Sequence, residues 1–418
     1  MNKEIKQRIE LIKKGKIPQG YQQTRAGLAP NDWVNGHISD ILFNEKRTVP
    51  KPQNGYWRIG IRSHAKGTFH EFVENPDEVD MDELYVVKKD DLIINITFAW
   101  EHAIALADEN DDGLLVSHRF PTYVFKKEQI PYFYLNVFVQ NRFKELLALI
   151  SPGGAGRNRV MSKKDFLQLP CFIPDFEEQQ KIAEILMQCD KVIELYEQEI
   201  EEFKKLKKAY LRKMFPKKGK NVPELRFAGF TDPWEQRKLG DECEVTMGQS
   251  PDGSTYSETP SDYILVQGNA DLKDGWVFPR IWTTQKTKTA HAGDLIMSVR
   301  APAGAMGKTA YDVVLGRGVA GINGNEFIYQ TLVKMDSEGY WKKLAAGSTF
   351  ESVNSDTVKN AELLVPQDIE EQKKIGAYFS SLDNLITLHQ RKVEEQKNQK
   401  KSLMQLLLTG IVRVKSSK

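Results

Sequence analysis

The chain contains nearly the same helix opening twice: residues 177–186 read EEQQKIAEIL and residues 370–379 read EEQKKIGAYF. The copies are offset by 370 − 177 = 193 residues, and the match continues without a gap for about forty positions. Identical pairs under this offset include Asp175/Asp368, Glu178/Glu371, Gln179/Gln372, Ile182/Ile375, Asp190/Asp383 and Lys207/Lys400. A match of this length indicates a tandem duplication, so each element around one helix should have a counterpart around the other.

Both repeated segments carry the signals of a helix start. Asp175 and Asp368 stand where an N-cap carboxylate accepts hydrogen bonds from free backbone N–H groups. Glu178 and Glu371 follow three residues later, the spacing of a capping box. A helix over about residues 177–215 would be roughly 58 Å long at about 1.5 Å per residue. Such a helix is too long to be enclosed in one small domain.

The apolar residues of these helices repeat every seven positions, as in the seam of a coiled coil. The second seam has a polar middle, at His389, Lys392, Gln396 and Gln399. Because each seam needs an apolar partner, we predict that the two helices pair within the chain. The predicted contact residues are Ile182, Ile185, Cys189, Val192, Tyr196, Phe203 and Leu206 in the first copy, and Ile375, Tyr378, Leu382, Leu385, Leu403 and Leu406 in the second.

The segments outside the helices also resemble each other. Each begins near a tryptophan, contains a short apolar strand after an acidic turn, and ends in a Gly/Ser loop, an apolar strand and a proline. Short β-rich runs with many turns predict two compact α+β domains separated by two long helices, in a tandem repeat. The expected division is an N-terminal helix or arm (1–30), a first globular domain (31–173), a first long helix (174–216), a linker with the second domain (217–365), and a second long helix with the C-terminal tail (366–418).

Composition limits the class of protein. Lys and Arg number 59 against 57 Asp and Glu, a net charge of +2, so any polyanion would have to be met by local patches. Three widely spaced cysteines cannot form a disulfide framework and lack zinc-site spacing. No stretch approaches the roughly 18 apolar residues of a spanning helix. We therefore expect a soluble, cytoplasmic protein.

Several kinds of catalytic chemistry have no motif in this chain. It has no GxxxxGK[ST] phosphate loop, and no Pro-Pro dipeptide, which the Asn/Asp-Pro-Pro-aromatic signature of DNA amino-methyltransferases requires. His64, His70, His102 and His118 lack HExxH spacing. We therefore expect no catalytic residues, no metal and no cofactor.

The two domains do supply side chains of the types that contact DNA. Arg, Asn and Gln read base edges, while Lys and backbone amides hold phosphates. Taken singly, each could be an ordinary solvated residue. The candidates are Arg58, Arg62, His64, Asn95, Trp100, His102, Arg119, Arg157, Asn158 and Arg159 in the first domain, and Gln249, Ser250, Gln267, Asn269, Lys286, Lys288, Arg300 and Arg317 in the second.

Three sets of residues resemble the specificity subunit of type I restriction-modification systems: VPELRFAGFTDPWEQRKLGD (222–241), the two helix openings, and LLLTGIVRV (406–414). In that family two target recognition domains each read one half of a bipartite DNA site. An antiparallel helix pair spaces them and docks two modification subunits. The resemblance implies a non-catalytic chain whose partners are double-stranded DNA, modification subunits and, in the larger complex, restriction subunits.

Other functions remain open at this point. One alternative is a coiled-coil scaffold joining two protein-binding domains, in which the helices only connect the domains. A second is the specificity chain of a combined nuclease-methylase system. A third is an enzyme with an unrecognised site.

Overall fold

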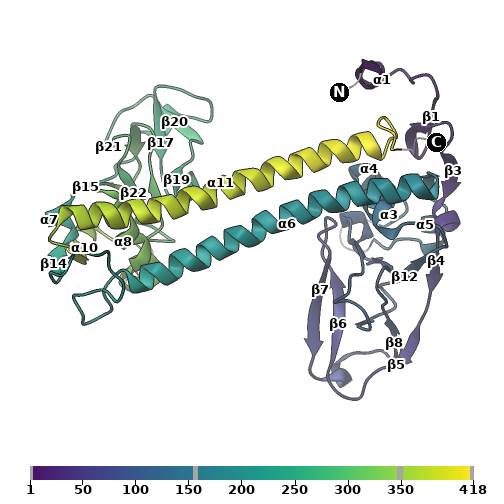
Figure 1. Cartoon of the computed structure of the whole chain (residues 1–418), viewed down its shortest axis with the longest axis horizontal. Coiled ribbons are helices and arrows are strands. Elements are labelled where there is room, and N and C mark those ends of the chain that lie inside the picture. Colours follow the sequence, from purple (N-terminus) through teal and green to yellow (C-terminus); the bar gives the residue numbers. More distant parts are fainter. Residues whose placement is uncertain (1–2, 154–158, 346–351, 415–418) are drawn as a thin grey trace. The chain divides into compact units, whose positions relative to one another are not determined.

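A computed structural model describes residues 3–153, 159–345 and 352–414 of the chain. The chain divides into two compact units, which we call unit 1 (Met1–Glu194 with Glu395–Lys418) and unit 2 (Leu195–Glu394). Two long helices, α6 (Phe176–Lys213) and α11 (Ile369–Leu407), each contribute to both units (Figure 1). The sequence predicted the first of these over about 177–215, within two residues at either end.

Unit 1 begins with a helix and a hairpin, followed in the described residues by strands and four short α-helices. The bounds are α1 Lys3–Lys13, β1 Tyr21–Thr24, β2 Gly27–Pro30, β3 Val34–His37, α2 Ile38–Ile41, β4 Leu42–Glu45, β5 Thr48–Pro50, β6 Tyr56–Ile61, β7 Thr68–Val73, β8 Glu83–Val86, β9 Leu92–Ile94, β10 Ile104–Leu106, β11 Leu115–Val116, β12 Thr122–Phe125, α3 Pro131–Phe138, α4 Asn141–Leu149, α5 Lys163–Leu167 and β13 Pro170–Ile173, with 3₁₀ turns at Pro76–Glu78 and Ala99–Glu101.

Unit 2 has the same kind of succession. Its bounds are β14 Glu235–Lys238, α7 Leu239–Glu242, β15 Glu244–Met247, β16 Tyr256–Ser257, β17 Tyr263–Val266, β18 Leu272–Lys273, β19 Trp276–Val277, β20 Ile281–Thr283, β21 Thr289–Ala290, β22 Leu295–Ser298, β23 Met306–Lys308, β24 Val313–Leu315, β25 Val319–Asn323, α8 Glu326–Ser337, α9 Tyr340–Ala345, α10 Ser355–Lys359 and β26 Glu362–Val365, with 3₁₀ turns at Gly253–Thr255 and Asn269–Asp271.

The strand order of the two units is the same. One sheet runs β10-β9-β12-β4 in unit 1 and β23-β22-β25-β15 in unit 2, where β19 and β18 extend it. The other contains β8-β11-β6-β7 and β21-β24-β17-β20. A two-stranded pair, β3 with β13 or β14 with β26, precedes each long helix. Equal order in both sheets shows that the duplication includes the whole domains.

A buried core joins each sheet to the helices. In unit 1, Leu92, Tyr123 and Phe166 pack with Leu186 of α6 and Leu407 of α11. In unit 2 a corresponding cluster joins strand β22 to both long helices. Smaller clusters between the two sheets of each unit contain mainly valine, isoleucine and alanine. The apolar faces of the long helices are therefore part of the domain cores.

The long helices pack against each other in antiparallel directions. In unit 1, Lys400 Nζ donates to Asp190 Oδ1 and Oδ2 at 2.5 and 2.6 Å. In unit 2, Lys207 Nζ donates to Asp383 at 2.7 and 2.9 Å. Since 383 − 190 = 400 − 207 = 193, the same two repeat positions are bridged in both units, with the helices exchanged. The predicted pairing is confirmed.

The predicted seam is correct in part. Ile182, Ile375 and Leu382 are buried. The prediction is wrong for Val192, Leu206 and Leu385, whose side chains are exposed. Ile193, the residue after Val192, is buried instead, and so is Ile200 one heptad later. A straight helix drifts about 20° per heptad relative to a strict seven-residue repeat, which moves the contact to the neighbouring residue. The other predicted contact residues are half-buried: Ile185, Cys189, Tyr196, Phe203, Tyr378, Leu403 and Leu406.

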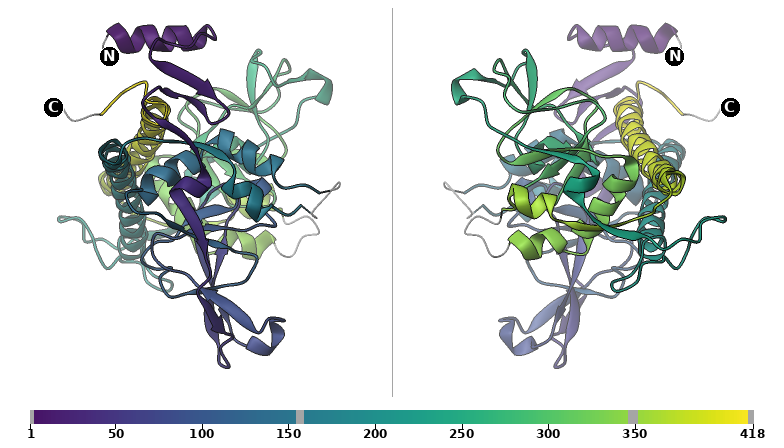
Figure 2. Two further views of the ribbon diagram at one scale, coloured as in Figure 1. Left: turned by 90° about the vertical axis from the view of Figure 1, so that its right-hand side faces the viewer. Right: turned by 90° about the vertical axis from the view of Figure 1, so that its left-hand side faces the viewer.

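The segment after α11 lies beside the N-terminal segment of unit 1, as Figure 2 shows. Arg8 Nη1 donates to the carbonyl of Ile411 at 3.1 Å, and the Tyr21 hydroxyl donates to the carbonyl of Gly410 at 2.6 Å. Gly410 follows α11 with φ of +64°, the left-handed conformation that commonly ends helices. The tail therefore belongs to the folded unit.

Candidate nucleic-acid interface

The sheet that contains β8-β11-β6-β7 and its counterpart in unit 2 each contain a parallel strand pair, and several candidate residues follow the strands of that pair. Strand β11 lies parallel to β6, and β24 lies parallel to β17. Parallel strands end at the same edge of a sheet, so the loops that follow them lie side by side. Arg62 and Arg119 follow β6 and β11; Gln267 and Arg317 follow β17 and β24. The two units thus place candidates at equivalent positions.

In unit 2, backbone hydrogen bonds bring several loops to residues 315–319. The Gln249 N–H donates to the carbonyl of Leu315 at 2.8 Å, and the Leu315 N–H donates to the carbonyl of Lys288 at 2.7 Å. The Arg317 N–H donates to Ser250 Oγ at 3.1 Å. The loop before Arg300 is held there too, by a bond from the Val299 N–H to Gly318, while Asn269 and Lys286 lie in the neighbouring turns.

Two glycines allow these loops to pack backbone on backbone. A Cβ at Gly318 would lie 2.0 Å from the carbonyl oxygen of Gln267, and a Cβ at Gly248 would lie 2.1 Å from the carbonyl oxygen of Gly316. Real carbon–oxygen contacts are much longer, so any other residue would push the loops apart. The close approach leaves the side chains of Gln249 and Arg317 on the outside, where both are exposed.

In unit 1 the corresponding loops are also linked. The Ile96 N–H donates to the carbonyl of Arg119 at 3.0 Å, and the His64 N–H donates to the carbonyl of Glu101 at 2.8 Å. Arg62, His64 and Arg119 are exposed. Arg62 lies over the ring of Phe69, with 5.2 Å from its Cζ to the ring centroid, and Nη1 donates to the Thr68 carbonyl. Within the described residues, the Arg119 guanidinium has no hydrogen bond or ion pair.

Five candidates of unit 1 have internal roles, and we remove them from the proposed contact set. Asn95 is buried and accepts hydrogen bonds from Thr97. His102 is buried, with Nε2 2.7 Å from the carbonyl oxygen of Phe138, and burial lowers the pKa of its ring. Arg159 donates to the Ser151 and Ala148 carbonyls at the end of α4, and Trp100 lies under its guanidinium. Arg58 is ion-paired to Glu71. The removed set is therefore Arg58, Asn95, Trp100, His102 and Arg159. Arg157 and Asn158 lie outside the described residues.

One cation near this edge was missed from the sequence. Lys163 Nζ lies 3.3 Å from the carbonyl oxygen of His118, next to Arg119. Burial and the charge of Lys46 lower the pKa of Lys163. The only local signal was Ser162, which caps α5 by accepting from the Asp165 N–H. That pattern indicates a helix start but says nothing about which loop the lysine will meet.

The sequence also missed a buried ion pair at the start of each long helix. In unit 2, Arg226 donates from Nε and Nη2 to the two carboxylate oxygens of Glu371, at 2.6 and 2.7 Å. In unit 1, Arg413 makes the same two-bond contact with Glu178, both bonds being 2.7 Å. The predicted N-cap at Asp175 is confirmed by a bond from the Glu178 N–H, but both glutamates bind arginine instead of closing a capping box.

The environment of Glu178 sets its ionisation. Burial would raise the pKa of this carboxyl, but hydrogen bonds from Arg413 and from Trp33 Nε1, the latter at 2.9 Å, outweigh it and hold the pKa below its ordinary value. Arg413 also donates to Asp32. The carboxylate therefore stays charged and fixes the helix start to both termini of unit 1.

Comparison with known proteins assigns the fold and the family. A profile of the type I restriction modification DNA specificity domain matches residues 30–205 and 231–398. The chain belongs to this family. The specificity-domain match occurs twice, in agreement with the duplication, and covers more than half of the chain.

Two relatives from Methanocaldococcus jannaschii carry specificity-subunit names. The type I restriction enzyme MjaX specificity subunit is 27% identical over 95% of this chain and 98% of its own length. The MjaVIII specificity subunit is 24% identical over 68% of this chain and 71% of its own. The chain is thus a specificity subunit with two recognition domains in tandem, a non-catalytic component of a type I restriction-modification system.

Two solved structures share the fold. The S subunit of a type I restriction-modification system from M. genitalium covers 94% of this chain and all of its own, with a TM-score of 0.56 at 13% identity. A chain from a study of type I R-M complex assembly and conformational transition covers 95% of this chain, with a TM-score of 0.55 at 21% identity. They confirm the predicted fold class of paired α+β domains with two long antiparallel helices.

Among the described residues, no group of three or more His, Cys, Asp or Glu side chains could hold a metal ion. No helix in the described part of the chain is both long and apolar enough to cross a membrane.

Proposed function

We propose that the two recognition domains read the two halves of a bipartite DNA sequence through the loops at the carboxyl edges of the parallel strand pairs. In this proposal the long helices dock two modification subunits, and restriction subunits join the larger complex. Cofactors and catalytic residues belong to those partners. The chain would hold the duplex so that a modification subunit can flip its target base, at an unstacking cost of about a few kcal/mol.

The observation that carries this proposal is the equivalence of Arg119 and Arg317. Both follow the second strand of the parallel pair, both are exposed, and neither guanidinium has a partner within the described residues. An arginine presented in this way can bind guanine through two hydrogen bonds, and each good pair discriminates between bases by about 1–3 kcal/mol. With a net charge of only +2, such local groups must supply the attraction for DNA.

The neighbours of these arginines differ between the units. Arg62 and His64 lie in the loop after β6, and Lys163, the first residue of α5, contacts the loop of Arg119, whereas Gln249 and Gln267 lie in the loops around Arg317. Cations contact phosphates or guanine, while glutamine matches adenine. The two domains share one fold but carry different side chains in these loops, which supports the reading of two unlike half-sites.

Exposed apolar residues repeated on the long helices support the docking of two equal partners. Leu195 and Leu388 are related by the offset of 193 and are 51% and 47% exposed; Val192 and Leu385 are related in the same way and are both 38% exposed. Leu195 lies two residues, about 200° of helical rotation, from buried Ile193, so it points away from the seam. Val192 with Leu195, and Leu385 with Leu388, are each three residues apart, so each pair lies on one face of its helix and gives both copies the same exposed apolar patch.

The first experiment exchanges one domain. Residues 231–365 are replaced by the matching block of another specificity subunit, the complex is assembled with its modification subunits, and methylated bases are mapped by long-read sequencing. One half of the methylated motif should change while the other stays. An unchanged motif would favour a scaffold without DNA contact.

Point variants test the loops themselves. Arg119→Ala should relax or lose one half of the motif, and Arg317→Ala the other half, each with about 10-fold to 100-fold slower methylation from a loss of about 1–3 kcal/mol. Arg58→Ala is the matched control, because that arginine is paired with Glu71. Loss of both halves by either single variant would contradict the assignment of one domain to each half-site.

Docking is tested separately by charge substitution on the helices. Leu195→Glu and Leu388→Glu should each remove one modification subunit, and the double variant both, as measured by light scattering of the assembled complex. Glu194→Lys, beside Leu195, is the control for a change of charge alone. Retention of both subunits by the double variant would reject these surfaces while leaving the DNA proposal standing.

A further inference from the structure

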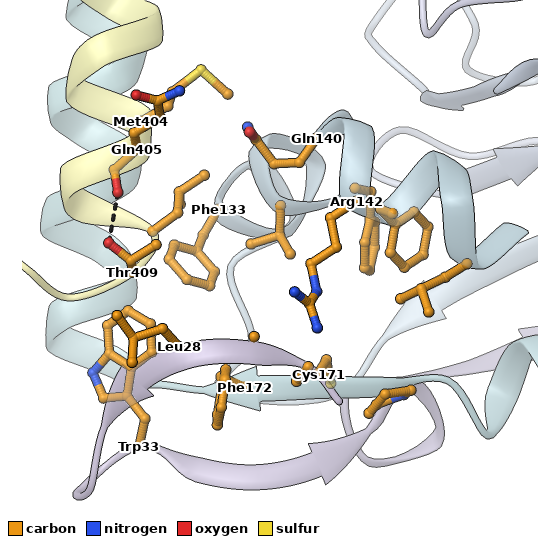
Figure 3. A pocket seen from close by; sticks show the side chains of 18 residues that line it. Leu28, Trp33, Phe133, Gln140, Arg142, Cys171, Phe172, Met404, Gln405 and Thr409 are labelled. Carbon is orange, nitrogen blue, oxygen red and sulfur yellow. Dashed lines mark hydrogen bonds between the residues drawn. The ribbon is translucent and has the colours of Figure 1, made fainter. Parts of the chain in front are cut away.

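Unit 1 contains a cavity of about 270 Å³ whose walls are mostly apolar. Figure 3 shows it between the β1–β2 hairpin, α3 and α4, strand β13 and the last turns of α11. Phe133, Phe138 and Phe143 line it on one side, and Leu28 and Leu408 on another. None of these elements belongs to the proposed DNA-contacting loops.

The duplication provides an internal comparison for this cavity. Since 408 − 215 = 193, Leu408 occupies the repeat position of Phe215 in unit 2. Phe215 is 4% exposed and packs against three aromatic rings, with centroid distances of 5.5 Å to Phe327, 5.7 Å to Trp234 and 5.9 Å to Phe379. In unit 1 the corresponding tryptophan, Trp33, lines the cavity beside the smaller leucine. A place that one repeat fills with an aromatic ring is therefore left open in the other.

A single cation faces the opening. The guanidinium of Arg142 points from α4 into the space between the apolar walls in Figure 3. One nitrogen, Nη2, donates to the carbonyl of Arg25 at 2.6 Å, and Nε and Nη1 remain for a further partner. The guanidinium lies against the backbone of Gly27, whose φ of +128° favours glycine. No carboxylate is among the residues that line the cavity, so its charge is positive.

We propose that this cavity binds an aromatic carboxylate, with the ring on Phe133, Phe143 and Leu408 and the carboxylate on the guanidinium of Arg142, at a donor that Arg25 does not use. A buried apolar cavity of about 150 Å³ accommodates benzene, so about 270 Å³ suits a ring with a short acidic chain. A hydrogen bond from a guanidinium to a carboxylate is charge-assisted and about twice as strong as one between neutral groups. The ligand is either a free aryl acid or an aromatic residue beside a carboxylate in a partner polypeptide.

The binding test uses 3-phenylpropionate as the probe and 3-phenylpropanol as its neutral analogue, titrated against the full chain by ligand-observed NMR. The acid should bind at least about 10-fold more tightly than the alcohol. Leu408→Phe, which places in unit 1 the residue that unit 2 already has, should remove binding of both and raise the thermal midpoint. Arg142→Gln should remove the preference for the acid while the alcohol still binds.

Two results would overturn the proposal. One is absence of probe binding to the unaltered chain at millimolar concentration. The other is unchanged binding of the acid to both the Leu408→Phe and Arg142→Gln chains, each shown to be folded by circular dichroism. Use of two variants protects the test against misfolding of either one.

A second measurement distinguishes the sources of the ligand. Assembly with the modification and restriction subunits is compared for the unaltered and Leu408→Phe chains. If Leu408→Phe weakens assembly, and if 3-phenylpropionate inhibits assembly of the unaltered chain only, the carboxylate belongs to a partner polypeptide. Equal assembly together with probe binding assigns it to a free acid. Both arms are independent of the DNA-contact variants above.

Discussion

Neutralising Glu371 should selectively destabilise unit 2. The side chain of Glu371 is 0% exposed and that of Arg226 is 12% exposed, and two hydrogen bonds of 2.6 and 2.7 Å join them. In Glu371→Gln the buried guanidinium loses its hydrogen-bonded counter-charge and keeps only the weaker influence of Asp232, and one of its two charged acceptors becomes an NH₂ group. The substitution keeps the shape of the side chain, so the loss is mainly electrostatic.

The magnitude follows from the burial of the pair. Removing one partner of a buried ion pair costs about 3–5 kcal/mol, because the remaining charge is left without solvent or counter-ion. Unit 2 contains 394 − 195 + 1 = 200 residues. For a domain of that size about 1 kcal/mol corresponds to roughly 2–4 °C, so the thermal midpoint of unit 2 should fall by about 6–20 °C.

Differential scanning calorimetry and urea unfolding measure this change. Glu370→Gln is the matched control. The Glu370 carboxylate pairs with Lys373 in solvent, and both side chains are at least 60% exposed. The control substitution should therefore change the free energy of unfolding by less than about 1 kcal/mol. The double variant Glu371→Leu with Arg226→Met should recover most of the loss, since an apolar pair carries no desolvation cost. Equal midpoints for Glu371→Gln and Glu370→Gln would refute the reasoning.

Three further predictions concern other contacts. Asp190→Lys and Lys400→Asp should each destabilise unit 1, and the double variant should recover part of the loss. Urea unfolding should give a coupling free energy of about 0.5–1 kcal/mol between the two positions. Additive losses would contradict the ion pair. The folded pKa of Glu178 lies below its ordinary 4.5, so its stabilisation is complete above that pH and is lost as the pH falls through the lower folded value. The difference in stability between the unaltered chain and Arg413→Met should therefore shrink as the pH is lowered below 4.5. A constant difference would exclude the linkage. Gly318→Ala places a Cβ 2.0 Å from the carbonyl oxygen of Gln267, so it should lower the free energy of unfolding of unit 2 by about 1–3 kcal/mol, as measured by calorimetry. It should also slow methylation through one half-site only.

The repeated helices were predictable because their signals are local. The N-cap at Asp175, the apolar periodicity and the proline after the first helix all act within a few turns of backbone, so they predicted its bounds within two residues. The offset of 193 needed no structure either. Duplication of the domains followed from the same comparison, since two copies of one sequence pattern fold in the same way.

The choice between neighbouring residues depended on tertiary packing. Val192 and Ile193 are both apolar and lie about 100° apart on the helix, so periodicity accepts either. Only the position of the partner helix buries Ile193 and exposes Val192. The burial of Asn95 and His102 could not be predicted from the local sequence either, because the Phe138 carbonyl that binds His102 lies 36 residues away along the chain.

The sequence alone therefore determined the duplication, the two long helices and the family, all of which rest on patterns of nearby residues. The tertiary structure decided which side chains form each site. Arg226 reaches Glu371 across 145 residues and Arg413 reaches Glu178 across 235. Parallel strands likewise bring Arg119 beside the loop of Arg62. Such contacts form only when distant segments are packed together, because the free energy that selects them comes from shared burial and charge rather than from local backbone preference.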